Sequence, residues 1–100
     1  MFDSVSDAIH AIRDGEMVVV VDDEGRENEG DLIMAAELAT AEAMSFIVRK
    51  ACGLVCVAIS EERADTLELP LMVARNTDRE RTAFAVSVDV IDGTTTGVSP

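Results

Sequence analysis

The sequence predicts an α+β fold of the α/β type, in which helices cover a mixed sheet. Three observations support this class. Residues 17–21 form an apolar, β-branched run too short for a helix, which is typical of a buried strand. Residues 83–90 alternate strictly, which is typical of a strand with one covered face. Residues 5–12 repeat apolar side chains at helical spacing instead, so helices packed on a sheet are expected.

The first helix has signals at both ends. Ser4 or Ser6 can accept hydrogen bonds from the first free amides, and Gly15 can end the helix. Three apolar side chains fall on one helical face: Val5, Ile9 and Ile12. The strand at residues 17–21 then leads into an acidic segment, after which residues 32–35 resume a short apolar run.

The second half of the chain continues the mixture. A helix is expected to start at Thr40 and to turn four side chains inward: Met44, Ile47, Val48 and Ala51. Residues 54–59 predict another strand. Ser60 can cap a short helix that runs through Leu67 and is limited by Pro70.

The final segments are loops around the last strand. Residues 75–81 predict a charged loop, and Asp92 with Gly93 predicts a turn. Since no closing element follows this strand, we expect the chain to be a truncated single domain, cut within a larger one.

Composition excludes several classes of protein. With 48% apolar residues, the chain is not of the disordered type. A net charge of −12 disfavours nucleic acid and anionic membranes as partners. No apolar run approaches the roughly 20 residues that span a bilayer, and the acidic amino terminus is unlike a secretory leader, so a cytoplasmic location is expected. Cys52 and Cys56 lack the further ligands of a standard structural zinc site.

The most informative segment is the acidic run at residues 22–31, which carries six carboxylates and one guanidinium. Two carboxylates about 4 Å apart repel by roughly 4 kcal/mol at an effective dielectric near 20. A folded protein must therefore keep such groups in water, pair them with cations, or leave some protonated.

If residues 27–31 are extended, Glu27, Glu29 and Asp31 point to one side, and Arg26 and Asn28 point to the other. Converging carboxylates suit a hard divalent cation such as Mg²⁺. An EF-hand is excluded, because Glu27 or Asn28 stands where its glycine is required. The alternative is an acidic loop that is simply solvated.

The run DDEGRENEGDLI at residues 22–33 resembles the signature of the 3,4-dihydroxy-2-butanone 4-phosphate synthase family. The likeness continues in order through most of the chain, at residues 36–37, 52–56, 69–72, 76–77, 82–84 and 93–99.

This resemblance implies a lyase of riboflavin biosynthesis that converts ribulose 5-phosphate to dihydroxybutanone phosphate and formate. It implies Mg²⁺ as cofactor, with Mn²⁺ as an alternative, and a homodimer with sites between subunits. By position, Glu27 matches a metal ligand that also meets substrate, and Arg26 and Asp31 match substrate-binding residues. Glu29 lies in the same motif and is a candidate acid/base or supporting group.

The resemblance also selects residues outside the acidic run. Cys56 matches a cysteine near the family's site, whereas its chemistry alone equally fits a buried core thiol. Thr95 and Thr96 match a polar loop beside the substrate, although either residue alone could belong to a plain turn. His10, the only histidine, lies outside the matched motif and is expected at the surface.

Two departures from the family pattern bear on activity. The family's second metal ligand is a histidine in a later Gly-His-Thr segment, which this sequence lacks. The resemblance therefore implies that residues 1–100 are the amino-terminal portion of a synthase domain, and the isolated chain is expected to have no turnover. Residues 78–81 replace the usual aromatic or histidine followed by glycine in a loop that covers the substrate. The competing interpretation is a non-catalytic Mg²⁺-binding or interaction module. A fused GTP cyclohydrolase domain stays open.

Overall fold

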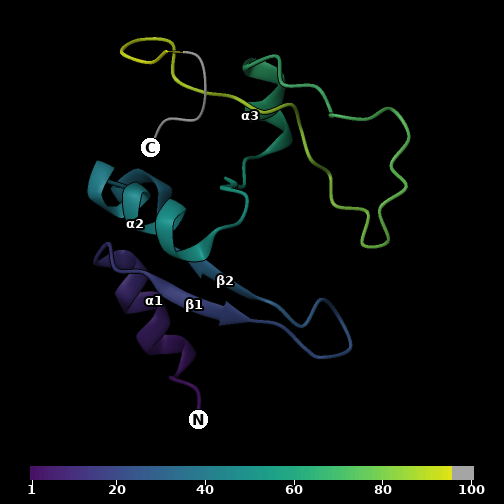
Figure 1. The fold of residues 1–100 in the computed structure, drawn as a ribbon. Helices are drawn as coiled ribbons and strands as arrows, with labels where there is room; N and C mark the ends of the chain where they lie inside the picture. The colour runs from purple at the N-terminus through teal and green to yellow at the C-terminus, as the bar shows by residue number, and fades with distance from the viewer. Residues whose placement is uncertain (96–100) are drawn as a thin grey trace. The chain divides into compact units, whose positions relative to one another are not determined.

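The computed structural model describes residues 1–95 and divides the chain into two compact units. The first unit is Met1–Cys56, and the second begins at Val57. Figure 1 traces the chain through its helices and strands. Of the two threonines in the predicted polar loop, Thr95 is described and Thr96 lies outside the described residues.

Helix α1, Val5–Arg13, begins as its sequence predicts. Of the two candidate caps, Ser4 is the one used: its Oγ accepts a hydrogen bond from the Asp7 amide at 3.1 Å. The helix ends at Asp14, and Gly15 follows with φ +80°, a conformation that glycine adopts without steric cost. Local side-chain chemistry therefore sets both ends of this helix.

Strands β1, Val18–Val21, and β2, Gly30–Ile33, pair antiparallel with Val18 opposite Ile33 and Val21 opposite Gly30. Helix α1 contacts β1, and helix α2 contacts β2 (Figure 1). The α+β class is thus confirmed. The expectation of a mixed sheet is wrong for residues 1–95, where the sheet has two antiparallel strands joined by a short loop.

A short 3₁₀ turn, Ala36–Leu38, leads to helix α2, Ala41–Ala51. The helix was expected to start at Thr40, and Thr40 is its N-cap. Of the four side chains expected to point inward, Met44 and Ile47 are half-buried. Val48 and Ala51 are exposed, because the described neighbours cover only part of the helix surface. The helix ends at Cys52 in the left-handed conformation, with φ +58°.

In the second unit, Ser60 caps helix α3, Glu61–Thr66. The helix ends one residue earlier than expected, and Leu67 is its C-cap. The only strand-like pairing among the unit's described residues is an isolated antiparallel bridge between Leu71 and Ala85. The Met72 amide donates to the Phe84 carbonyl, and the Val86 amide donates to the Pro70 carbonyl.

The strands predicted at residues 54–59 and 83–90 are therefore not formed as ladders within residues 1–95. Both segments have the composition of strands, but a strand exists only where a neighbour accepts and donates its backbone hydrogen bonds. Residues 54–59 make no backbone hydrogen bond with the described part of the chain. Composition predicted the tendency of these segments to form strands, but strand formation also needs a partner strand, which composition does not reveal.

Burial is incomplete throughout the described residues. No side chain among them is fully buried, and large apolar side chains such as Leu54, Val88 and Ile91 face solvent, Ile91 with 92% of its surface exposed. Within the same residues, no helix has the length and apolar character needed to cross a bilayer. The elements described here thus leave much apolar surface without a covering layer.

Replacing Thr40 by Ala tests the cap of α2. The Thr40 Oγ1 accepts a hydrogen bond from the Ala43 amide at 3.1 Å, and losing such a cap costs about 1 kcal/mol. We expect faster amide exchange in the first turn of α2, measured by NMR. Thr40→Ser keeps the hydroxyl and should behave like the parent chain. Equal exchange in all three proteins would show that the cap does not hold the helix start.

Candidate metal and substrate site

The acidic loop connects β1 to β2 and contains a tight turn over residues 24–27. Asp23 organises the start of this turn. Its carbonyl accepts a hydrogen bond from the Arg26 amide at 2.9 Å, and its Oδ1 accepts from the Gly25 amide at 2.7 Å. The loop is thus a defined turn and not a free run of charges.

Asp22 is the centre of the loop. Its Oδ2 accepts a hydrogen bond from the Glu27 amide, its Oδ1 accepts from the Glu29 amide, both at 3.0 Å, and Arg26 Nη1 lies 3.1 Å from Oδ2. The side chain is 21% exposed. The Glu29 amide, then the Glu27 amide and the Arg26 charge, hold the pKa of Asp22 below its ordinary value, because each stabilises the carboxylate.

The predicted alternation of Glu27, Glu29 and Asp31 on one side is wrong. Residues 24–27 form a turn, and Asn28 takes a left-handed conformation with φ +53°, so the backbone is not extended through this segment. Asparagine tolerates this conformation better than most residues. Among residues 1–95, no three His, Cys, Asp or Glu side chains gather as a metal-binding group.

The individual carboxylates still suit a shared metal site. Glu27 is 38% exposed at its side chain and lies 4.0 Å from Arg26 Nη2, and Glu29 and Asp31 are exposed. Asp31 is fixed on β2 opposite Val20. Mg²⁺ commonly takes only one or two carboxylates and keeps several waters, so the donor set of this loop fits one part of a magnesium site.

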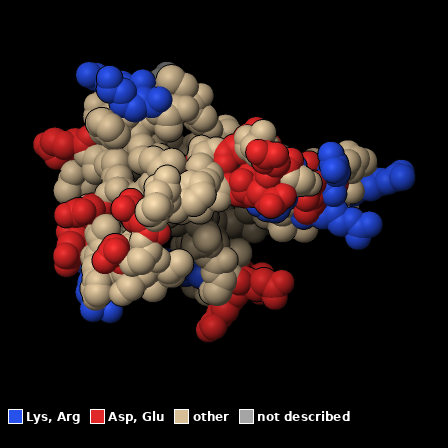
Figure 2. All heavy atoms as spheres, turned by 90° about the horizontal axis from the view of Figure 1, so that it is seen from below, with Lys and Arg blue, Asp and Glu red and all other residues tan. Residues whose placement is uncertain are grey.

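Figure 2 shows acidic side chains gathered in a dense group on the face seen from below, with further acidic groups separate from it. The acidic run itself carries six carboxylates over residues 22–31, which repel an anion unless cations intervene. Within the loop, Arg26 is the cation, and its guanidinium is held by Asp22. A negatively charged small molecule at this loop therefore requires Arg26, a metal ion, or both.

The remaining predicted site residues lie elsewhere in the chain. Cys56 is at the end of the first unit and exposed, so its interpretation as a buried core thiol is wrong for the described residues. Thr95 belongs to the second unit and is exposed. His10 is exposed on α1, as expected. The structure thus orders the acidic loop through Asp22 and Asp23, and the roles assigned to the site residues stay predictions.

The loop that departs from the family pattern has its own organising aspartate. Asp78 Oδ2 accepts a hydrogen bond from the Thr82 amide at 3.0 Å, and the Asn76 side chain bonds to both the Asp78 amide and the Thr82 carbonyl. The Thr82 amide is the main cause that lowers the pKa of Asp78. Glu80 pairs with Arg79 at 3.5 Å, so its charge is partly offset within the loop.

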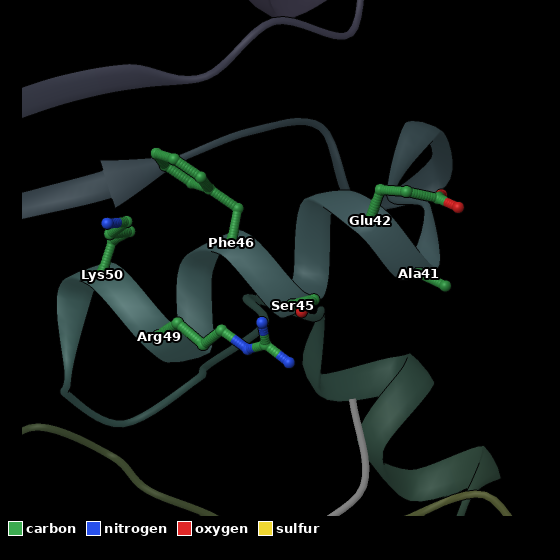
Figure 3. Close-up of a pocket in the computed structure, with 6 residues that line it drawn as sticks. All are labelled: Ala41, Glu42, Ser45, Phe46, Arg49 and Lys50. Carbon is green, nitrogen blue, oxygen red and sulfur yellow. The ribbon is translucent and has the colours of Figure 1, made fainter.

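An open pocket of about 520 Å³ lies on one helix, α2. Figure 3 shows its lining, with Phe46 and Lys50 pointing to the same side of the helix. The lining residues all come from this helix: Ala41, Glu42, Ser45, Phe46, Arg49 and Lys50. None of them is a predicted site residue, and a single helix face does not enclose a substrate.

Helices beside a small antiparallel sheet, with one arginine and several carboxylates in the connecting loop, define an α+β domain with an acidic hairpin loop. Residues 6–100 match the family model described as 3,4-dihydroxy-2-butanone 4-phosphate synthase. The chain belongs to this family, which confirms the resemblance carried by residues 22–33.

Similar proteins agree with this assignment. The 3,4-dihydroxy-2-butanone 4-phosphate synthase of Agrobacterium fabrum is 59% identical over 95% of this chain and 45% of its own length. The Candida albicans synthase is 54% identical over 99% of this chain and 48% of its own. A crystal structure of a synthase in complex with two magnesium ions matches with TM-score 0.91 and 52% identity, over 98% of this chain and 46% of that one.

The chain therefore spans about half the length of these curated relatives. The sequence predicted site roles for Arg26, Glu27, Glu29 and Asp31, which stay predictions, but gave Asp22 no role beyond one more charge, although its carboxylate accepts two amides of the loop. A usable signal was its position: the first aspartate after a strand, ahead of a glycine-containing turn, is well placed to accept amides from the returning chain.

The pH dependence of the loop at residues 76–82 can be measured directly. Because folding lowers the pKa of Asp78, its contribution to loop stability is present above the ordinary value of 3.8 and is lost as pH falls through the lowered pKa. We expect the Thr82 amide resonance to titrate by NMR with a midpoint below 3.8. Asp78→Asn should remove this titration. A midpoint at or above 3.8 would contradict the hydrogen-bonded carboxylate.

Proposed function

We propose that this chain supplies the acidic-loop half of a lyase that converts D-ribulose 5-phosphate to 3,4-dihydroxy-2-butanone 4-phosphate and formate in riboflavin biosynthesis. The observation that carries the proposal is the match, at TM-score 0.91, to a synthase that holds two magnesium ions. The ordered loop with Arg26 and Glu27 adds support, because it presents a cation and a carboxylate from one fixed turn.

In this proposal Glu27 holds Mg²⁺ and meets the substrate, Arg26 and Asp31 bind the sugar phosphate, and Glu29 moves a proton. Bound Mg²⁺ supplies a Lewis acid that stabilises negative charge developing on the substrate oxygens. Abstraction of a proton beside a carbonyl needs a carboxylate base near that carbon. Glu29 is exposed and makes no hydrogen bond through its carboxylate within residues 1–95, so it is free for this task.

Further parts of the proposal rest on the family. Cys56, Thr95 and Thr96 are proposed to lie near the substrate. The active protein is proposed to be a cytoplasmic homodimer that accepts Mn²⁺ in place of Mg²⁺ and binds neither nucleic acid nor membranes. The net charge of −12 supports the last point, since phosphate backbones and anionic lipids are repelled.

A non-catalytic Mg²⁺-binding module is the second candidate. One observation bears on it: among residues 1–95, no three potential ligand side chains gather around a point, so these residues by themselves form no complete catalytic metal centre. Both candidates predict that the isolated 100 residues release no formate, because the family's Gly-His-Thr segment is absent from the sequence. They differ once the remaining part of the synthase is supplied.

The test is a chimera in which this chain replaces the matching 45% of the Agrobacterium fabrum synthase. Formate release from ribulose 5-phosphate with Mg²⁺ should fall within about tenfold of the parent synthase. Glu27→Gln in the chimera should lower the rate about a hundredfold or more, because several kcal/mol of charge stabilisation by the metal are lost.

Glu61→Gln is the matched control, since it removes the same charge from exposed helix α3 and should leave the rate unchanged. A folded chimera without formate release would overturn the enzymatic proposal and favour the binding module. Equal rates for the Glu27 and Glu61 variants would remove Glu27 from the metal site.

A further inference from the structure

We propose that Asp22 is a positioning residue of the site, which fixes the backbone of Glu27 and Glu29 and orients the Arg26 guanidinium. The inference rests on the proposed function, because positioning matters for catalysis only if these three residues act on metal or substrate. The resemblance to the synthase family assigns no role to Asp22.

Asp22 contacts three of the four candidate residues in the acidic run, with Asp31 as the exception. One carboxylate contacts residues four, five and seven positions later, through Arg26 Nη1 and the amides of Glu27 and Glu29. Both carboxylate oxygens take part, Oδ2 with Arg26 and Glu27 and Oδ1 with Glu29. In the described part of the chain, no other side chain donates to or accepts from the backbone of residues 26–29.

Asp22 is placed to do this by the sheet. Val21 pairs with Gly30, and the Asp22 amide donates to the Glu29 carbonyl at 3.3 Å, which brings the two ends of the loop together. The carboxylate then lies within hydrogen-bonding distance of the Glu27 and Glu29 amides. These bonds are exposed, but an ionised acceptor makes stronger hydrogen bonds than a neutral one, so Asp22 favours this loop conformation over others in which water solvates the amides.

These contacts indicate that Asp22 acts by ordering the loop and not as a direct metal ligand. A carboxylate offers about four acceptor positions, and three of those on Asp22 are used by protein donors. Glu27 and Glu29, by contrast, are held through their backbone amides and keep their carboxylates exposed. Asp22 thus orders the loop, and the carboxylates of Glu27 and Glu29 are left to bind the metal or the substrate.

Amide exchange in the 100-residue chain tests the structural half of the inference. Asp22→Ala should speed exchange at the Glu27 and Glu29 amides at least about tenfold, because both lose their acceptor. Asp22→Asn keeps one oxygen and should therefore free only one of the two amides. Glu24→Gln removes the same charge from a loop residue whose carboxylate makes no hydrogen bond in residues 1–95, and should change neither amide.

Kinetics of the chimera test the functional half. Asp22→Ala should lower kcat about a hundredfold, since displacement of reacting groups by about 1 Å has this effect, and should raise the Mg²⁺ concentration for half-maximal rate. Its melting temperature should match that of Glu24→Gln. A purely structural role would instead lower the melting temperature and leave the Mg²⁺ dependence unchanged.

The outcomes are distinguishable. If the parent chimera is active and Asp22→Ala equals Glu24→Gln in rate and Mg²⁺ dependence, the positioning role is overturned and the proposed function stands. If the folded parent chimera releases no formate, the proposed function fails and the positioning role fails with it. If Asp22→Ala does not fold, Asp22→Asn decides: unchanged exchange at both amides and an unchanged rate overturn the role.

Discussion

The candidate site depends on one set of interactions, the hydrogen bonds that the Asp22 carboxylate accepts within the loop between β1 and β2. Asp22 satisfies two amides and a guanidinium at once, at 3.0 to 3.1 Å, directly after the pair Val21 and Gly30 closes the loop. Without this carboxylate, the Glu27 and Glu29 amides would lose their side-chain acceptor, and Asp23 would still hold the start of the turn. The price of concentrating negative charge is thus offset by amide dipoles and one arginine.

The rest of the described chain is less complete than this loop. Helices α1 and α2 each contact one strand of a two-stranded sheet, and no described side chain is fully buried. The chain spans about half the length of its curated relatives, which have about as many residues again to cover such apolar surface. Activity is therefore proposed for the assembled synthase domain and not for these residues alone.

Local features were predictable from sequence because their causes are local. Ser4, Thr40 and Ser60 cap the helices they precede, as a hydroxyl next to free amides predicts. Residues 54–59 and 83–90 were predicted as strands but lack ladders in the described chain, because pairing depends on a neighbour that composition does not reveal. The alternation of Glu27 to Asp31 failed because the turn at residues 24–27 and Asn28 redirect the backbone.

The proposed function requires the ordered loop to bind a divalent cation, whereas the other acidic segments are only solvated. Paramagnetic Mn²⁺ titrated into the 100-residue chain tests this by NMR, with Glu61 and Glu62 of helix α3 as an internal acidic reference. Selective broadening of the Arg26, Glu27 and Glu29 amides, reversed by excess Mg²⁺, is the predicted result. Equal broadening of loop and helix would mean that these carboxylates are only a solvated surface.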